Sequence, residues 1–103
     1  MSRRAVGRCE DLWAGEMAGV RVGASPVVIV NVDGVLYAYE DRCPHRGVPL
    51  SRGRLEGNAL VCGAHEWTYD ACTGHGLNPC SAALRAFSIS PHVKMGWMML
   101  TVP

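Results

Sequence analysis

The chain has 103 residues, of which 49% are apolar, and it carries a formal net charge of +1. A chain of this size and composition forms one small domain, and its near-neutral balance gives no reason to expect nucleic acid as a partner. The longest purely apolar run, residues 26–30, is far shorter than the roughly 20 residues that cross a bilayer, and the N-terminal residues lack the apolar segment of a signal peptide. We therefore expect a single cytoplasmic domain over residues 1–103, with no membrane partner.

Strand patterns prevail along the chain, and no segment longer than a turn or two has a helical period. The clearest stretch is PVVIVNVDGVLYAYE, residues 26–40, in which β-branched and alternating residues flank an Asp33-Gly34 turn typical of a hairpin. Further short strands are expected over residues 15–22, 83–90 and 96–102, with turns at Ser25-Pro26 and Ser90-Pro91. We predict an all-β domain of short antiparallel strands.

Between about residues 41 and 82 the strand pattern gives way to Gly, Pro, Cys and His. The stretch CPHRG offers Cys43 and His45, and the stretch VCGAHEW offers Cys62 and His65. Sixteen residues separate the two pairs, so the layout is C-x-H, sixteen residues, C-x-x-H. Two similar loops, each with one sulfur and one nitrogen donor, predict a shared metal centre.

Two metal centres fit these donors. Zinc takes two Cys and two His in structural sites, but zinc modules usually set like ligands in pairs. A [2Fe–2S] cluster with one iron on two thiolates and the other on two imidazoles explains why each loop carries one of each. A small hairpin over residues 54–61 would bring the loops together in either case. The mixed loops favour the cluster and leave zinc as the alternative.

The stretches CPHRGVPLSRG and CGAHEWTYD closely resemble the two cluster-binding loops of Rieske proteins. The resemblance implies that Cys43 and Cys62 bind one iron through sulfur, and that His45 and His65 bind the other iron through a ring nitrogen. It also implies the Rieske fold, in which an antiparallel β-sandwich base bears a small cluster-binding subdomain, here at about residues 41–82.

Within this family the sequence resembles the soluble ferredoxins. Many respiratory Rieske proteins carry an extra cysteine in each loop, joined as a disulfide, whereas Val48 and Ala64 stand at those positions here. The stretch WTYDACTGHGLNP is most similar to the ferredoxin component of toluene-, alkene- or isoprene-type diiron monooxygenases. That resemblance implies a shuttle that takes single electrons from an NADH-dependent flavin and iron–sulfur reductase. It would deliver them to a diiron hydroxylase that oxidises an aromatic hydrocarbon or an alkene.

Other members of the family stay open as alternatives: the ferredoxin of a Rieske ring-hydroxylating dioxygenase and the small subunit of a nitrite reductase. A zinc-stapled interaction module is the alternative outside the family. We expect no catalysis by the chain itself, because its sequence offers no nucleophile with a base and a cluster with four ligands leaves no open site. We expect a monomer with small, short-lived contacts, as electron-transfer encounters need.

The ligand set fixes the expected potential. Two thiolates and two neutral imidazoles leave the oxidised cluster without net charge, so an added electron meets less repulsion than with four thiolates, and Rieske centres lie at about −150 to +300 mV. Trp67 stands where high-potential relatives have a hydroxyl donor, which indicates the low end of this range. Tyr69 acts in the opposite direction, since the resemblance implies that its hydroxyl donates to a cluster sulfur and stabilises the reduced state.

Arginines crowd the first loop, at positions 42, 46, 52 and 54. Their charge, including that of Arg46 beside the ligand, would favour the extra electron and attract an acidic docking surface, or they are only solvated. The three remaining cysteines pack as small hydrophobes or lie free, and a Cys72–Cys80 bridge stays open. His75 is expected to be structural, because four ligands complete the cluster.

Overall fold

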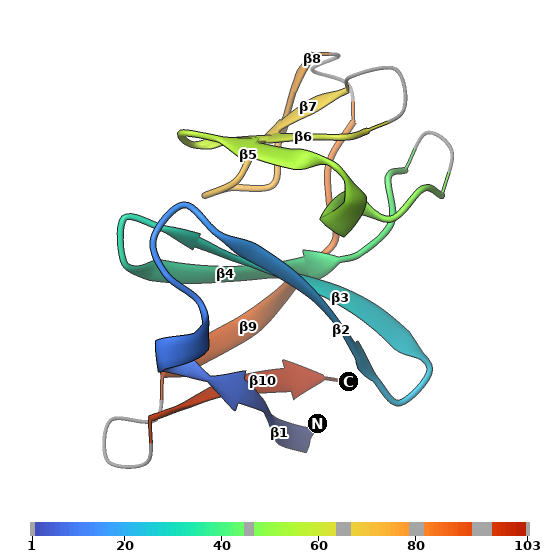
Figure 1. Ribbon diagram of the computed structural model, residues 1–103. Coiled ribbons are helices and arrows are strands. Elements are labelled where there is room, and N and C mark those ends of the chain that lie inside the picture. The colour runs from blue at the N-terminus through green and yellow to red at the C-terminus, as the bar shows by residue number, and fades with distance from the viewer. Residues whose placement is uncertain (1, 45–46, 64–66, 79–81, 92–95, 103) are drawn as a thin grey trace.

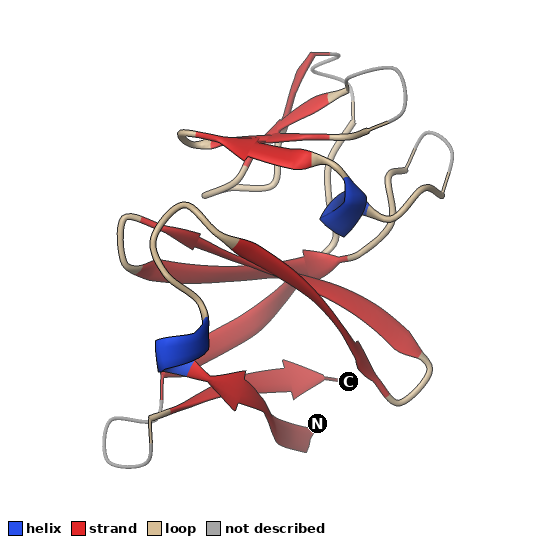
Figure 2. Cartoon of the chain, in the orientation of Figure 1, coloured by secondary structure: helices blue, strands red, loops and turns tan. Residues whose placement is uncertain are grey.

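The computed structural model describes residues 2–44, 47–63, 67–78, 82–91 and 96–102, and these form ten strands and two 3-10 helices (Figures 1 and 2). Every strand pairing within this described part is antiparallel, which confirms the all-β prediction. The base is a six-stranded sheet of β1 (Ser2–Arg8), β10 (Trp97–Val102), β9 (Ala86–Pro91), β4 (Val35–Glu40), β3 (Ser25–Val32) and β2 (Met17–Val22), in that order. A smaller sheet has the order β5 (Arg54–Glu56), β6 (Ala59–Val61), β7 (Thr68–Asp70) and β8 (Gly76–Asn78).

The hairpin of β3 and β4 is the part of the base that the sequence predicts best. Asp33 and Gly34 both have positive φ, at 52° and 90°, as a two-residue type I′ turn requires. Val32 pairs with Val35 across this turn, and the register continues to Val27 opposite Glu40. The Asp-Gly pair therefore sets the register that places the end of β4 next to the first loop.

Strand β3 is buried on both faces, which explains its unbroken apolar run. Val28, Val30 and Val32 face a core shared with the small sheet, while Val27 and Ile29 face a second core within the curled base. The second core is completed by residues from β4, β10 and the segment after β1, including Ala38, Leu100, Met98 and Leu12. Burying each such side chain contributes about 1.5–3 kcal/mol, so β3 is the main support of both layers.

Several boundaries differ from the sequence-based expectation. Strand β1 was not expected, because SRRAVGR has few apolar residues; it pairs with β10 at a sheet edge, where charged side chains remain in water. The turn before β3 lies at residues 23–24, since Pro26 already pairs with Arg21. Strand β9 continues to Pro91, which pairs with Met98, so the expected Ser90-Pro91 turn is strand instead.

The small sheet is the predicted subdomain. Its first hairpin spans residues 54–61, as predicted, and turns at Gly57, whose φ is +59°. Figure 1 shows this sheet stacked on one side of the base, with both chain ends close together on the other side. Two 3-10 helices, η1 (Cys9–Asp11) and η2 (Leu50–Arg52), complete the described elements. No helix in the described part of the chain has the length and apolar character needed to span a membrane.

Candidate metal centre

The two predicted ligand loops begin in the same way, each directly after a strand or its extension. Cys43 follows the end of β4 and Cys62 follows β6. The Cys43 amide donates to the Val48 carbonyl (2.8 Å), and the Cys62 amide donates to the Trp67 carbonyl (2.7 Å). Each cysteine is therefore hydrogen-bonded to the residue five positions later, which closes both loops at their base. Gly47, with φ +71°, makes the first loop possible and donates to the Cys43 carbonyl (2.7 Å).

Both cysteine side chains are fully buried, at 0% exposure, and both belong to the core between the two sheets. The predicted ligands His45 and His65 lie outside the described residues, as do Arg46 and Ala64. Among the described residues, no group of three Cys, His, Asp or Glu side chains comes together. Two of the four predicted ligands are thus positioned by the structure, and the imidazole pair stays a prediction.

Tyr69 lies against the first cysteine. Its hydroxyl oxygen is 3.5 Å from the Cys43 Sγ, and the side chain is fully buried. Burial, followed by the hydrogen bond with Cys43 and the charges of Cys43 and Cys62, raises the pKa of Tyr69 well above its ordinary value. The phenol therefore keeps its proton and can donate it to the Cys43 sulfur. Trp67 is half-buried and packs against the same core.

Two contacts support the first loop, and neither was predicted from the sequence. The Asp41 carboxylate is 8% exposed and accepts from the Ser51 amide (2.8 Å) and the Ser51 hydroxyl (2.6 Å), so it joins the end of β4 to η2. Gly53, just after η2, packs directly on the backbone of Val61, leaving no room for a Cβ atom. Single-sequence patterns do not reveal such contacts, because each depends on how the chain folds back over eight to ten residues of loop, 3-10 helix and hairpin.

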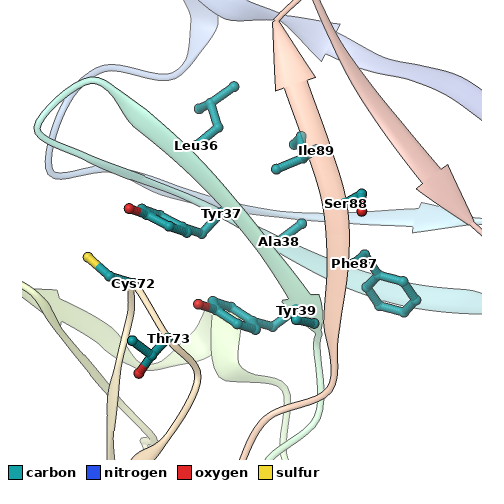
Figure 3. A pocket seen from close by; sticks show the side chains of 10 residues that line it. Leu36, Tyr37, Ala38, Tyr39, Cys72, Thr73, Phe87, Ser88 and Ile89 are labelled. Atoms are coloured by element: carbon teal, nitrogen blue, oxygen red, sulfur yellow. The ribbon is translucent and has the colours of Figure 1, made fainter.

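The segment after β7 packs the small sheet onto β4 (Figure 3). There the Cys72 thiol points toward the Tyr37 hydroxyl at the edge of a surface hollow of about 300 Å³, and the hydrogen bond between them raises the pKa of Tyr37. The Tyr39 hydroxyl donates to the Ala71 carbonyl (2.6 Å). Cys72 thus has a packing role, while Cys80 lies outside the described residues.

His75 takes part in the same segment through its backbone. It forms a β-bridge with Ala83, its carbonyl accepts from the Asp70 amide (2.8 Å), and its side chain is exposed. This placement suits the structural role expected for it. Val48, which stands where respiratory relatives have a cysteine, is half-buried against the core beside Cys43.

Comparison with known proteins identifies the fold. Residues 2–88 match the family described as Rieske [2Fe-2S] domain. The alkene monooxygenase ferredoxin of Xanthobacter autotrophicus (strain ATCC BAA-1158 / Py2) is 41% identical over 81 residues, which are 78% of this chain and 66% of that protein. The ferredoxin component of the naphthalene 1,2-dioxygenase/salicylate 5-hydroxylase systems of Ralstonia sp is 30% identical over 81 residues, which are 78% of each protein.

Solved structures agree with the sequence comparison. A chain in the complex of reduced oxygenase and oxidized ferredoxin in carbazole 1,9a-dioxygenase superposes with a TM-score of 0.85 at 33% identity, over 96% of this chain and 92% of that one. The protein therefore belongs to the Rieske [2Fe–2S] family, and the predicted Rieske fold is confirmed. It is a ferredoxin with a [2Fe–2S] cluster, an electron carrier of the kind that multicomponent oxygenases use.

The described residues fit this cofactor by the chemistry of their donors. Two buried thiols lie at the base of two loops closed in the same way, and a protonated phenol lies against one thiol. The cluster supplies one-electron redox chemistry when bound. The family match favours it over the zinc alternative left open by the ligand spacing.

Proposed function

We propose that Cys43 and Cys62 bind one iron of the cluster and that His45 and His65 bind the other. The support is the pair of loops with identical closure, together with the C-x-H and C-x-x-H spacing. In this arrangement the Tyr69 hydroxyl donates to the Cys43 sulfur, and the hydrogen bonds between Asp41 and Ser51 hold the first loop in position. A fixed backbone and buried donors reduce the rearrangement that accompanies each electron transfer.

We further propose that the chain accepts single electrons from an NADH-dependent flavin and iron–sulfur reductase and delivers them to the diiron hydroxylase of a monooxygenase. The observation that carries this assignment is the 41% identity to an alkene monooxygenase ferredoxin, against 30% for the naphthalene/salicylate component. The hydroxylase substrate would be an alkene or an aromatic hydrocarbon. Because NADH is the source of electrons, the proposal includes a cytoplasmic location.

A second candidate is the ferredoxin of a ring-hydroxylating dioxygenase. It is favoured by the 33% identity and close superposition with a chain from the carbazole 1,9a-dioxygenase complex. In both candidates the chain does the same work, and only the oxygenase that accepts the electron differs.

The two candidates separate in a single-turnover experiment. The chemically reduced protein, freed of reductant, is mixed with the diiron hydroxylase of an alkene monooxygenase or with the oxygenase of a naphthalene dioxygenase. Oxidation of the ferredoxin is followed by its visible absorption, and product is measured after quenching. We expect faster oxidation and more product with the diiron hydroxylase. Productive transfer to the dioxygenase alone would overturn the monooxygenase assignment.

A further inference from the structure

Two adjoining hollows beside the first loop are lined with arginine. The larger, of about 470 Å³, has Arg21, Arg42 and Arg52 in its lining, and the smaller, of about 250 Å³, has Arg42 and Arg85. Arg42 and Pro26 line both hollows, so the two form one continuous surface. We call this surface the arginine flank and define it by Arg21, Arg42, Arg52 and Arg85.

Little of this positive charge is neutralised. Arg42 and Arg85 share one carboxylate, that of Glu40, at 3.9 Å and 3.8 Å. Each arginine side chain is 65% exposed, so its charge faces water and remains available to a partner. Arg21 and Arg52 are exposed as well, and neither forms an ion pair with another residue that the structure describes.

One further carboxylate lies in the floor of the larger hollow. Asp41 is buried, and its oxygens are occupied by the amide and hydroxyl of Ser51. Even with Glu40 and Asp41 counted against the four arginines, the flank keeps a formal charge of +2, whereas the whole chain carries +1. The molecule is therefore electrically asymmetric, with its positive side at the flank.

The flank adjoins the first ligand loop, because Gly47 and Pro49 of that loop line the larger hollow. Arg42 directly precedes Cys43, and its guanidinium lies against the turn at Gly47. Arg52 ends η2, which follows the same loop. A partner held on the flank is thus held beside the loop that carries Cys43.

We propose that the arginine flank is a docking surface for an acidic face of the protein that accepts the electron. Guanidinium groups bind carboxylates through paired hydrogen bonds, and a concentrated charge raises the rate of encounter. The sequence-based expectation counted Arg54 among the docking arginines. The arginine flank does not include Arg54, which forms an ion pair with Glu56 at 2.7 Å. The flank does include Arg21 and Arg85, which line its hollows. The inference rests on the proposed function only in requiring a protein electron acceptor.

The test uses one electron-accepting protein in two charge states. The reduced ferredoxin is mixed in a stopped-flow instrument with cytochrome c, which is basic, or with fully succinylated cytochrome c, in which carboxylates replace the lysine charges. We expect the succinylated form to oxidise the ferredoxin about tenfold faster at low ionic strength, and this advantage to disappear in 0.5 M salt (about 4 Å Debye length). Equal rates, or faster reaction with native cytochrome c, would overturn the proposal.

Charge reversal within the chain provides the matched comparison. Arg85→Glu and, separately, Arg21→Glu should slow oxidation by the succinylated protein by roughly threefold to tenfold at low salt. Arg8→Glu makes the same change of charge near η1, away from the flank, and should alter the rate by less than about twofold. Equal slowing by all three variants would show a net-charge effect and refute a local surface. The oxygenase is absent from this test, so its outcome is independent of the monooxygenase assignment.

Discussion

At the scale of single residues, the Tyr69 hydroxyl is the described group best placed to adjust the cluster potential. It touches the Cys43 sulfur and keeps its proton. A donor to that sulfur favours the more negative, reduced state. We therefore expect Tyr69→Phe to lower the reduction potential by roughly 40 mV, which corresponds to about 1 kcal/mol for one electron. Protein-film voltammetry or a dye-coupled titration measures the shift.

Tyr37→Phe is the control for this prediction. Tyr37 also loses a hydroxyl on substitution, but its partner is the Cys72 thiol at the surface hollow. Its removal should leave the potential unchanged within error. If both substitutions shifted the potential equally, or if Tyr69→Phe raised it, the proposed hydrogen bond to the ligand sulfur would be wrong.

Tyr39 predicts a dependence of stability on alkaline pH. Burial, with smaller contributions from Cys72, Asp70 and Tyr37, raises the pKa of Tyr39 to about 12 in the folded protein, against an ordinary value near 10. The folded state thus holds this proton more tightly, so its contribution to stability is complete below about pH 10 and is lost as the pH rises toward about 12.

The variant Tyr39→Phe isolates this contribution. At pH 8 it should be less stable than the parent by about 1–3 kcal/mol, because the hydroxyl that binds the buried Ala71 carbonyl is lost. Between about pH 10 and 12 the difference should shrink, because the unfolded parent chain releases the phenol proton in this range and is stabilised by doing so, whereas the Phe variant has no such proton. Denaturant unfolding at several pH values tests this, and a difference that stays constant to pH 11.5 would contradict it.

At the scale of elements, the join between η2 and β6 depends on glycine. A Cβ atom on Gly53 would clash with the Val61 carbonyl, which directly precedes Cys62 in the chain. A Cβ atom on Gly63 would make only ordinary van der Waals contacts, the nearest with the Arg52 carbonyl oxygen at 3.4 Å. We expect Gly53→Ala to destabilise the protein by about 1–3 kcal/mol.

Gly63→Ala is the control for this join and should change the unfolding free energy by less than about 0.5 kcal/mol. Thermal or denaturant unfolding of the two holoproteins compares them directly. Similar losses of unfolding free energy in both variants would show that the close contact between Gly53 and Val61 is not the cause of the destabilisation.

Some elements of this fold could be predicted from the sequence and others could not. The β3–β4 hairpin was predictable because Asp33-Gly34 fixes the turn, and the cysteine loops were predictable because thiols and imidazoles recur at a metal-binding spacing. Strand β1 was not, since its pairing with β10 comes from the far end of the chain. The arginine flank was only half predicted for the same reason: Arg85 reaches Glu40 through the β4–β9 pairing.

At the scale of the whole molecule, the division into two cores predicts the result of removing the cluster. The core that contains Cys43 and Cys62 is shared by the small sheet and β3, whereas the core around Ile29 and Leu100 lies within the base alone. Without metal, we expect amides of β5 to β8 to exchange at least about tenfold faster with solvent, while β3 keeps most of its protection. Hydrogen-exchange mass spectrometry of holo- and apoprotein tests this. Uniform loss of protection would mean that the two layers unfold as one.

The central claim is that two cysteines and two histidines hold a [2Fe–2S] cluster in this fold. The most direct measurement is the EPR spectrum of the dithionite-reduced protein, with iron and sulfide assayed on the same sample. We expect two irons and two sulfides per chain and a rhombic signal whose average g value lies below that of clusters held by four cysteines. A signal of the four-cysteine type, or stoichiometric zinc with no iron and no signal, would contradict it.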